Sequence, residues 1–186
     1  MTTGVRGVGV DTVDLGAFAV SLAEPGTRFT GAFSGTERRQ CRERAESRGA
    51  APGTGAAPGT GSAPGTGASS SSSSSRFTQL RSGVRSGPDE ALARHLAVRW
   101  AAKEAVVKAW SAALYGSPPP IPPDLLRWSE IETVCDAWGR PAIRLSGEVA
   151  RQVAATVGED ARWNVSLSHD GGSAIAFVVL EGPISQ

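Results

Sequence analysis

The sequence predicts an α+β fold: a small, mostly antiparallel sheet packed on helices, one of them long. Three observations lead to this class. Residues 5–11 alternate small and apolar side chains as a strand does. A helical pattern begins near Pro88 and continues to about residue 114, before Gly116 and a proline run. Two pairs of short strand patterns follow, each pair around a turn that contains glycine.

Local signals mark the helices before the long one. Asp14 is placed to cap a helix over residues 15–23, which Pro25 and Gly26 end. Ser34 and Glu37 have the spacing of a capping box, in which the two residues satisfy each other's backbone N–H groups. We expect a helix to begin there and to continue to about residue 48.

The C-terminal half predicts two hairpins with a helix between them. Residues 130–137 and 141–146 flank the turn Trp138-Gly139-Arg140. Ser146 opens a short helix to about Val157. Residues 163–170 and 173–181 form the second hairpin around Gly171 and Gly172.

The charge balance does not favour nucleic acid as a partner. The formal net charge is +1, so no broad basic surface is expected. One arginine cluster alternates with glutamates, which predicts a solvated helix face. A basic patch that receives an acidic protein partner is the alternative. The cluster comprises Arg38, Arg39, Arg42, Arg44 and Arg48, interleaved with Glu37, Glu43 and Glu46.

Cysteine spacing and hydropathy argue against a disulfide-rich, zinc-binding, secreted or membrane-spanning protein. Cys41 and Cys135 are far apart and form neither a CxxC nor a metal-ligand spacing, so we expect no disulfide framework and no zinc site. The N-terminal residues do not have the pattern of a signal peptide. No apolar run is long enough to cross a membrane. We therefore expect a cytoplasmic protein.

A low-complexity segment interrupts the chain. Residues 51–68 are tandem copies of APGTGA-like units, and a serine run over residues 69–75 follows. Such a composition buries too little apolar surface to offset the entropy of ordering it. We expect residues 1–186 to form one domain, interrupted at about residues 49–75 by a disordered linker with an r.m.s. span of about 30 Å.

The window RWAAKEAVVKAW, residues 99–110, concentrates unusual charges. Lys103 and Lys108 are the only lysines among the chain's 19 basic residues. At 100° per residue, Glu104 and Lys108 share one helix face, which is rich in alanine, whereas Lys103 lies about 140° from Lys108. An ordinary i,i+4 surface pair would explain Glu104 and Lys108. The alternative is a ligand site on a face of small residues.

Two further segments supply charges at the ends of predicted strands. Asp11 ends the first strand, and His169 and Asp170 end the strand over residues 163–170. Carboxylates together with a phosphate-carrying ligand would suit Mg²⁺, which prefers oxygen and keeps several waters. A lysine nearby would act as a point charge on phosphate.

Three blocks in this order resemble the holo-acyl-carrier-protein synthases, the short type of 4′-phosphopantetheinyl transferase. They are GVGVDTVDL near the N-terminus, RWAAKEAVVKAW on the long helix, and VSLSHDGGSAIAFVVLE near the C-terminus. The first and third blocks are similar to actinobacterial members. The resemblance covers nearly the whole chain apart from the linker. It implies the 4′-phosphopantetheinyl transferase fold.

The resemblance also implies a reaction and its participants. The 4′-phosphopantetheine of coenzyme A would pass to a serine of apo-acyl carrier protein, with release of 3′,5′-ADP, as part of fatty acid biosynthesis. Asp11 and Glu104 would bind Mg²⁺, and Lys108 would contact phosphate. Arg99, Lys103 and His169 would line the nucleotide and pyrophosphate site. The family works as a homotrimer with its active site between subunits.

Several alternatives stay open at this point. The serine's proton could pass to a metal-bound water held by Glu104 or Asp11, or to His169 with Asp170 beside it. The carrier could instead belong to a polyketide or peptide synthetase. A coenzyme A-binding trimer without catalysis is a third possibility. The linker is absent from the family pattern, and we expect it to be a tolerated insertion.

Overall fold

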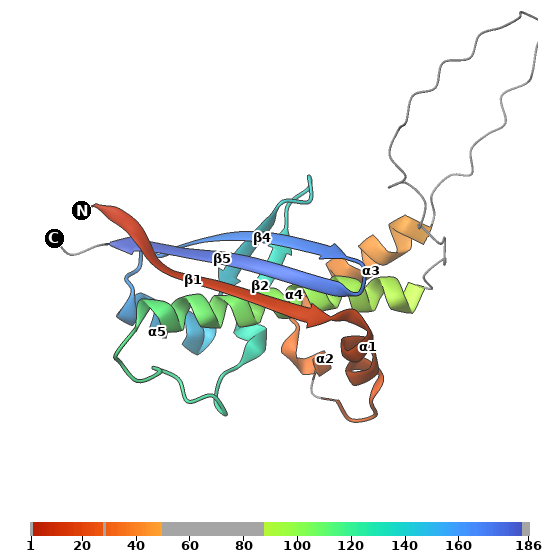
Figure 1. Cartoon of the computed structure of the whole chain (residues 1–186), viewed down its shortest axis with the longest axis horizontal. Helices are drawn as coiled ribbons and strands as arrows, with labels where there is room; N and C mark the ends of the chain where they lie inside the picture. The colour runs from red at the N-terminus through yellow and green to blue at the C-terminus, as the bar shows by residue number, and fades with distance from the viewer. Residues whose placement is uncertain (1, 28, 50–87, 184–186) are drawn as a thin grey trace, which may run out of the picture.

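The computed structural model describes residues 2–27, 29–49 and 88–183 of the chain. A three-stranded antiparallel sheet forms one layer, and the long helix α4 (Pro88–Ala113) runs along its inner face (Figure 1). A separate two-stranded sheet and the remaining helices lie around α4. The predicted α+β class, with a small antiparallel sheet and one long helix, is confirmed.

Most predicted elements are present within a few residues of their expected bounds. The short helix α2 and the 3₁₀ turn η1 were not predicted. The predicted linker, apart from Gly49, lies outside the described residues. In chain order the elements are β1 (Thr3–Asp14), α1 (Leu15–Ala23), α2 (Phe29–Ala32), α3 (Gly35–Gly49), α4, η1 (Trp128–Glu130), β2 (Ile131–Cys135), β3 (Pro141–Leu145), α5 (Gly147–Thr156), β4 (Arg162–Asp170) and β5 (Ser173–Pro183).

The main sheet has the order β1-β5-β4, so the last strand lies between the first strand and β4. In this register Asp11 pairs with Ala176, and His169 pairs with Ala174. Side chains alternate between a face covered by α4 and an exposed face. Asp11 and His169 both belong to the covered face, on opposite sides of β5.

Glycine and alanine allow α4 and β1 to touch backbone to backbone. A Cβ atom at Gly7 would collide with the carbonyl oxygen of Ala109, and one at Gly9 with that of Ala105. Ala105 and Ala109 are completely buried. The small-residue face of the helix therefore receives β1. The close approach that these small residues permit is made, at Ala105 and Ala109, by the backbone of β1.

The outer edge of β2 is covered by side chains from α3 and α4 instead of by another strand. The Glu37 carboxylate accepts the N–H of Thr133 at 2.9 Å. The Gln40 amide accepts the N–H of Cys135 and donates to its carbonyl, each at 3.0 Å. Lys103 donates to the carbonyl of Ile131. These contacts satisfy backbone groups that would otherwise be an open edge.

The predicted helix caps are confirmed. The Asp14 carboxylate accepts the N–H of Ala17 at 2.8 Å. Ser34 Oγ accepts the N–H of Glu37 at 3.1 Å, and the Glu37 carboxylate accepts the N–H of Ser34 at 2.9 Å. However, Glu37 is completely buried, which corrects its expected place on a solvated face of α3.

Both cysteines are free thiols, as expected. Burial, opposed in part by the charge of Arg99, raises the pKa of the Cys41 thiol to about 11. Among the described residues, no helix is long and apolar enough to cross a membrane.

Replacing Gly9 with alanine should destabilise the protein by about 3 kcal/mol, because the added methyl group meets the rigid carbonyl of Ala105. Urea unfolding followed by circular dichroism measures the loss. Gly35→Ala is the matched control, since a Cβ atom there has no neighbour within 4 Å. Equal stability of the two variants would contradict the backbone contact.

Candidate active site

Asp11, Glu104 and Lys108 converge where β1 crosses α4. Lys108 Nζ lies 2.7 Å from Asp11 Oδ1 and donates to the carbonyl of Val10 at 3.1 Å. Glu104 is one helical turn before Lys108 on α4, and its carboxylate is near enough to Asp11 for the charge of Asp11 to affect its pKa. The contact between α4 and β1 thus brings two segments far apart in sequence to one site.

The carboxylates of Asp11 and Glu104 lie close together, and the charge of Asp11 affects the pKa of Glu104. Burial, together with the proximity and negative charge of Asp11, raises the pKa of Glu104 to about 7. Lys108 and the Trp100 indole oppose this rise. The hydrogen bond to Asp11 also raises the pKa of Lys108. Near neutral pH the site therefore favours added positive charge.

The donor set suits a hard divalent cation. Asp11 Oδ2 is buried and has no hydrogen-bond donor, so it is available as a ligand oxygen. Within the described ranges, no group of three or more His, Cys, Asp or Glu residues could hold a metal. Mg²⁺ binds through one or two carboxylates, with water and substrate phosphate completing its coordination. Asp11 and Glu104 fit that pattern.

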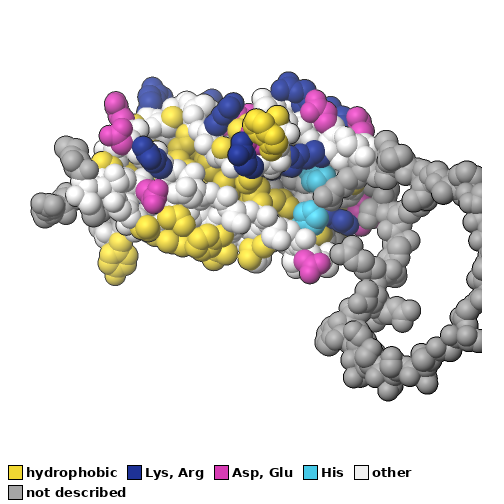
Figure 2. Space-filling view, turned by 90° about the horizontal axis from the view of Figure 1, so that it is seen from above, with side chains coloured by type: hydrophobic (Ala, Val, Ile, Leu, Met, Phe, Trp, Pro, Cys, Tyr) yellow, Lys and Arg dark blue, Asp and Glu magenta, His cyan; other side chains and the backbone are white. Residues whose placement is uncertain are grey.

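A second polar stripe on α4 faces away from this pair. Arg99 is only 3% exposed, and its Nη1 donates to the carbonyl of His95 at 3.2 Å. Its Nε and Nη2 are buried without a hydrogen-bond partner. The ring of His169 on β4 lies 6.4 Å from that of His95, centroid to centroid. Figure 2 shows the two histidine side chains next to each other on one face of the molecule.

Lys103 is in the protein interior. Its ammonium group is completely buried and lies 2.9 Å from the Glu37 carboxylate. It also donates to the carbonyls of Trp128, at 3.0 Å, and Ile131. Burial lowers the pKa of Lys103, and the charge of Glu37 opposes this change. Lys103 is therefore a buried, ion-paired residue, whereas the Lys108 side chain is 55% exposed, so the two lysines lie in different environments.

The side chains of Asp170 and His169 point to opposite faces of β4, as expected for neighbouring residues of a strand. The Asp170 side chain is on the exposed face of β4, whereas His169 is on the covered face. Asp170 Oδ1 accepts the N–H of Gly171 at 2.9 Å, as a turn residue does. The structure therefore gives no support to Asp170 as a partner of His169.

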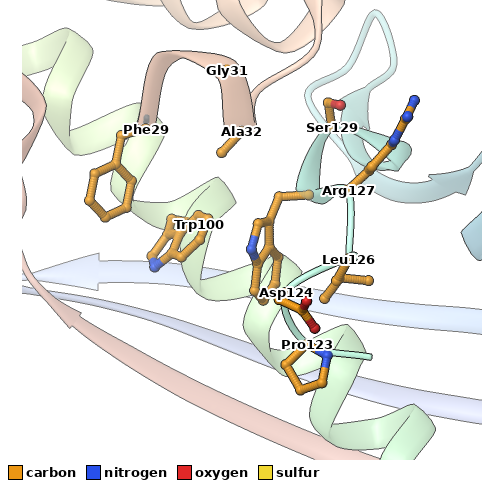
Figure 3. Close-up of a pocket in the computed structure, with 10 residues that line it drawn as sticks. Phe29, Gly31, Ala32, Trp100, Pro123, Asp124, Leu126, Arg127 and Ser129 are labelled. Atoms are coloured by element: carbon orange, nitrogen blue, oxygen red, sulfur yellow. The ribbon is translucent and has the colours of Figure 1, made fainter. Parts of the chain in front are cut away.

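A cavity of about 420 Å³ lies against α4 at Trp100. Figure 3 shows Phe29 and Trp100 on one side of it and Pro123, Asp124, Leu126 and Arg127 on the other. Trp128 also lines it. Trp100 is one helical turn before Glu104 on the same helix.

The sequence did not reveal two features: the burial of the Glu37 carboxylate, and the aromatic wall that Phe29, Trp100 and Trp128 form beside the cavity. The capping box accounts for Glu37 by its contact with Ser34 nearby in the chain. Its second partner, Lys103, is 66 residues away, and no local pattern indicates that contact. A lysine within an apolar helix segment was the available signal, because a buried ammonium needs a carboxylate partner.

Comparisons with known proteins agree with this geometry. The profile of the 4′-phosphopantetheinyl transferase superfamily matches residues 74–178. A holo-[acyl-carrier-protein] synthase of Corynebacterium glutamicum is 38% identical over 173 residues, covering 93% of this chain and 96% of that protein. The corresponding synthase of Mycobacterium ulcerans is 37% identical over 178 residues, with coverages of 96% and 98%.

Solved structures show the same relationship. The ACPS–CoA complex of Chronobacterium ammoniagenes has a TM-score of 0.68 and 35% identity, covering 99% of this chain and 100% of that one. The acyl carrier protein synthase of Mycobacterium tuberculosis has a TM-score of 0.58 and 30% identity, with coverages of 97% and 100%. The chain belongs to the 4′-phosphopantetheinyl transferase superfamily and, within it, to the holo-acyl-carrier-protein synthases.

Lys103→Met should destabilise the fold by about 3–5 kcal/mol, because it leaves the Glu37 charge buried without its partner. The double variant Glu37→Gln with Lys103→Met should recover part of this loss, since it removes the unpaired charge and keeps an acceptor for Thr133. Chemical denaturation of both variants tests the pair. A double variant less stable than Lys103→Met would show that the charge is not the cause.

Proposed function

We propose that this protein transfers 4′-phosphopantetheine from coenzyme A to a serine of apo-acyl carrier protein, with Mg²⁺ bound and 3′,5′-ADP released. The observation that carries the proposal is the convergence of Asp11, Glu104 and Lys108 in a chain of this family. Two carboxylates and a partly exposed ammonium group suit a metal-bound pyrophosphate. The resemblance and the donor chemistry agree on these residues.

The reaction exchanges a phosphoanhydride bond for a phosphodiester bond. The serine oxygen forms a bond to the phosphorus that carries pantetheine, and the bond from that phosphorus to the bridging oxygen of the pyrophosphate breaks. The leaving group is 3′,5′-ADP. Mg²⁺ held by Asp11 and Glu104 would neutralise charge on the pyrophosphate and orient it. Such transfers depend mainly on positioning and charge stabilisation.

The protein's own cations have separate tasks in this proposal. The Lys108 side chain is 55% exposed, so its ammonium group can reach a phosphate while Asp11 orients it. Arg99 has two buried N–H groups without partners, which suits an anion, and we assign it to the nucleotide phosphates with His169. In this proposal His169 is the acceptor for the serine's proton, because Glu104 is assigned to the metal.

We also propose that the protein works as a homotrimer. The outer face of the main sheet exposes a patch of apolar side chains, and such a patch typically marks an interface. Val10 and Phe177 are register partners at its centre. The patch consists of Val5, Val8, Val10, Ile175 and Phe177, which are 41–59% exposed.

Glu104→Ala should reduce transfer at least about a hundredfold while leaving the fold intact, because one of two metal-binding carboxylates is lost. Intact-mass spectrometry of apo-acyl carrier protein incubated with enzyme, coenzyme A and Mg²⁺ measures the added phosphopantetheine, with EDTA as the metal control. Near-normal turnover of the variant would contradict the assignment.

A panel with polyketide and peptide synthetase carriers identifies the preferred acceptor. Coenzyme A binding without transfer to any carrier would support a non-catalytic role.

Phe177→Glu should give monomers and abolish transfer, because it places a charge in the centre of the apolar patch. Light scattering after gel filtration measures the mass, and circular dichroism verifies the fold. Val20→Glu is the matched control, since Val20 is 74% exposed on α1 and lies outside the patch. A wild-type chain that is monomeric at micromolar concentration would refute the assembly.

A further inference from the structure

A second cavity lies at the C-terminal end of α4, beside the segment that follows the helix. Its volume is about 360 Å³. Val107 and Trp110 of α4 line it, together with Ile121 and Leu126 of the following segment, and none of the described residues that line it is charged. Leu126, which Figure 3 shows on the wall of the cavity at Trp100, lines both cavities. The two cavities therefore adjoin.

Proline keeps this second cavity open. Five of the residues 118–123 are prolines, and their rings fix the backbone angle φ, so the segment has few conformations in which to collapse. Ile121 within this run is 9% exposed and packs into the core. The N–H of Ser117 donates to the carbonyl of Leu114 at 2.8 Å, which closes the turn before the prolines. The cavity is thus preformed, as small-molecule sites of this size usually are.

The cavity begins on the face of α4 that carries Glu104. At 100° per residue, Ser111 lies about 20° around the helix from Glu104 and about 10 Å further along its axis. Ser111 is exposed and lines the cavity. Val107, which also lines it, precedes Lys108 in the chain. The cavity and the carboxylate site therefore occupy neighbouring parts of one helix face.

The residues that line the cavity determine what can occupy it. Ser111 and Ser117 supply its side-chain hydroxyl groups, and most of the other lining side chains are aliphatic or proline. A nucleotide, a peptide or the amides of a pantetheine arm would bury polar groups there with few partners, which is costly. A hydrocarbon chain has no such cost and gains from each buried CH₂ group. At about 30 Å³ per heavy atom, the share of one water molecule in the liquid, the volume holds a chain of up to about twelve atoms.

We propose that this cavity binds the acyl chain of an acyl-coenzyme A thioester, so that the protein transfers acyl-4′-phosphopantetheine directly to a carrier protein. This inference rests on the proposed function. The bonds that form and break at phosphorus are the same as for unloaded coenzyme A, and 3′,5′-ADP is again the leaving group. The thioester stays intact, because it is at the opposite end of the pantetheine arm. The product is a carrier protein that is already acylated.

Initial rates of transfer from acetyl- and octanoyl-coenzyme A to apo-acyl carrier protein test the proposal, and intact-mass spectrometry identifies the acyl group on the product. We expect the KM for octanoyl-coenzyme A to be at least about tenfold below the KM for acetyl-coenzyme A, because its additional CH₂ groups are buried. Equal KM values, or a KM that rises with chain length, would overturn the proposal.

Ser111→Trp places a ring in the cavity and should bring the ratio of the two KM values close to one. Ala112→Trp is the matched control, since Ala112 is the next residue of α4, is exposed and does not line the cavity. Its ratio should stay within about twofold of the wild-type ratio. Ser117→Trp narrows the cavity from the segment after the helix, and it decides the matter if Ser111→Trp does not fold.

Two results with these variants would show that the chain binds elsewhere and would overturn the proposal. One is a wild-type ratio in folded Ser111→Trp, or in Ser117→Trp should that variant alone fold. The other is an equal loss of the ratio in Ser111→Trp and Ala112→Trp.

Failure of the proposed function would look different. A wild-type protein that transfers nothing from unloaded coenzyme A would refute the transferase itself. Calorimetric titration with acetyl- and octanoyl-coenzyme A, without carrier protein, would then still decide whether the cavity holds the chain. Tighter binding of octanoyl-coenzyme A that Ser111→Trp removes would support the site, and equal affinities would overturn it.

Discussion

The close contact between α4 and β1 determines the rest of this structure. Because Gly7 and Gly9 have no side chains, the strand backbone lies directly on the alanine face of the helix. This close packing allows Asp11 on β1 to lie 2.7 Å from Lys108, although the strand continues to Asp14 and does not end at Asp11 as the sequence predicts. A wider spacing would move the carboxylate away from the helix, and the two halves of the site would be separate.

One side of helix α4 borders water and another faces the protein interior, and one lysine lies in each environment. Lys108 is at the edge with water, and Lys103 is in the interior. Lys103 meets three oxygens, from Glu37, Trp128 and Ile131, which match the three donors of an ammonium group. A planar guanidinium is larger and directs its donors in one plane, so arginine would not replace lysine there. This explains lysine at position 103 in a chain that otherwise relies on arginine.

The elements with local signals were predictable from sequence. Strand alternation, the Asp14 cap, the Ser34–Glu37 box and the helical arithmetic that placed Glu104 beside Lys108 all depend on neighbours within a few residues. The resemblance supplied Asp11 as the third member of the site. The Lys103–Glu37 pair and the aromatic wall around Trp100 could not be predicted, because they depend on how α3, α4 and η1 pack. The approach of β1 to the alanine face could not be predicted for the same reason, because a pattern of small residues indicates a close neighbour and does not identify it.

The central place of β5 also determines the order in which the protein can assemble. Within the described residues, β1 has no strand partner other than β5, and their register joins Thr3 to Pro183. A ribosome must therefore synthesise β5 before β1 can be fixed in the sheet. Pairing between such distant segments carries a large loop-closure entropy and slows folding. Asp11 is made long before Ala176, its partner across the sheet, so its surroundings are completed late.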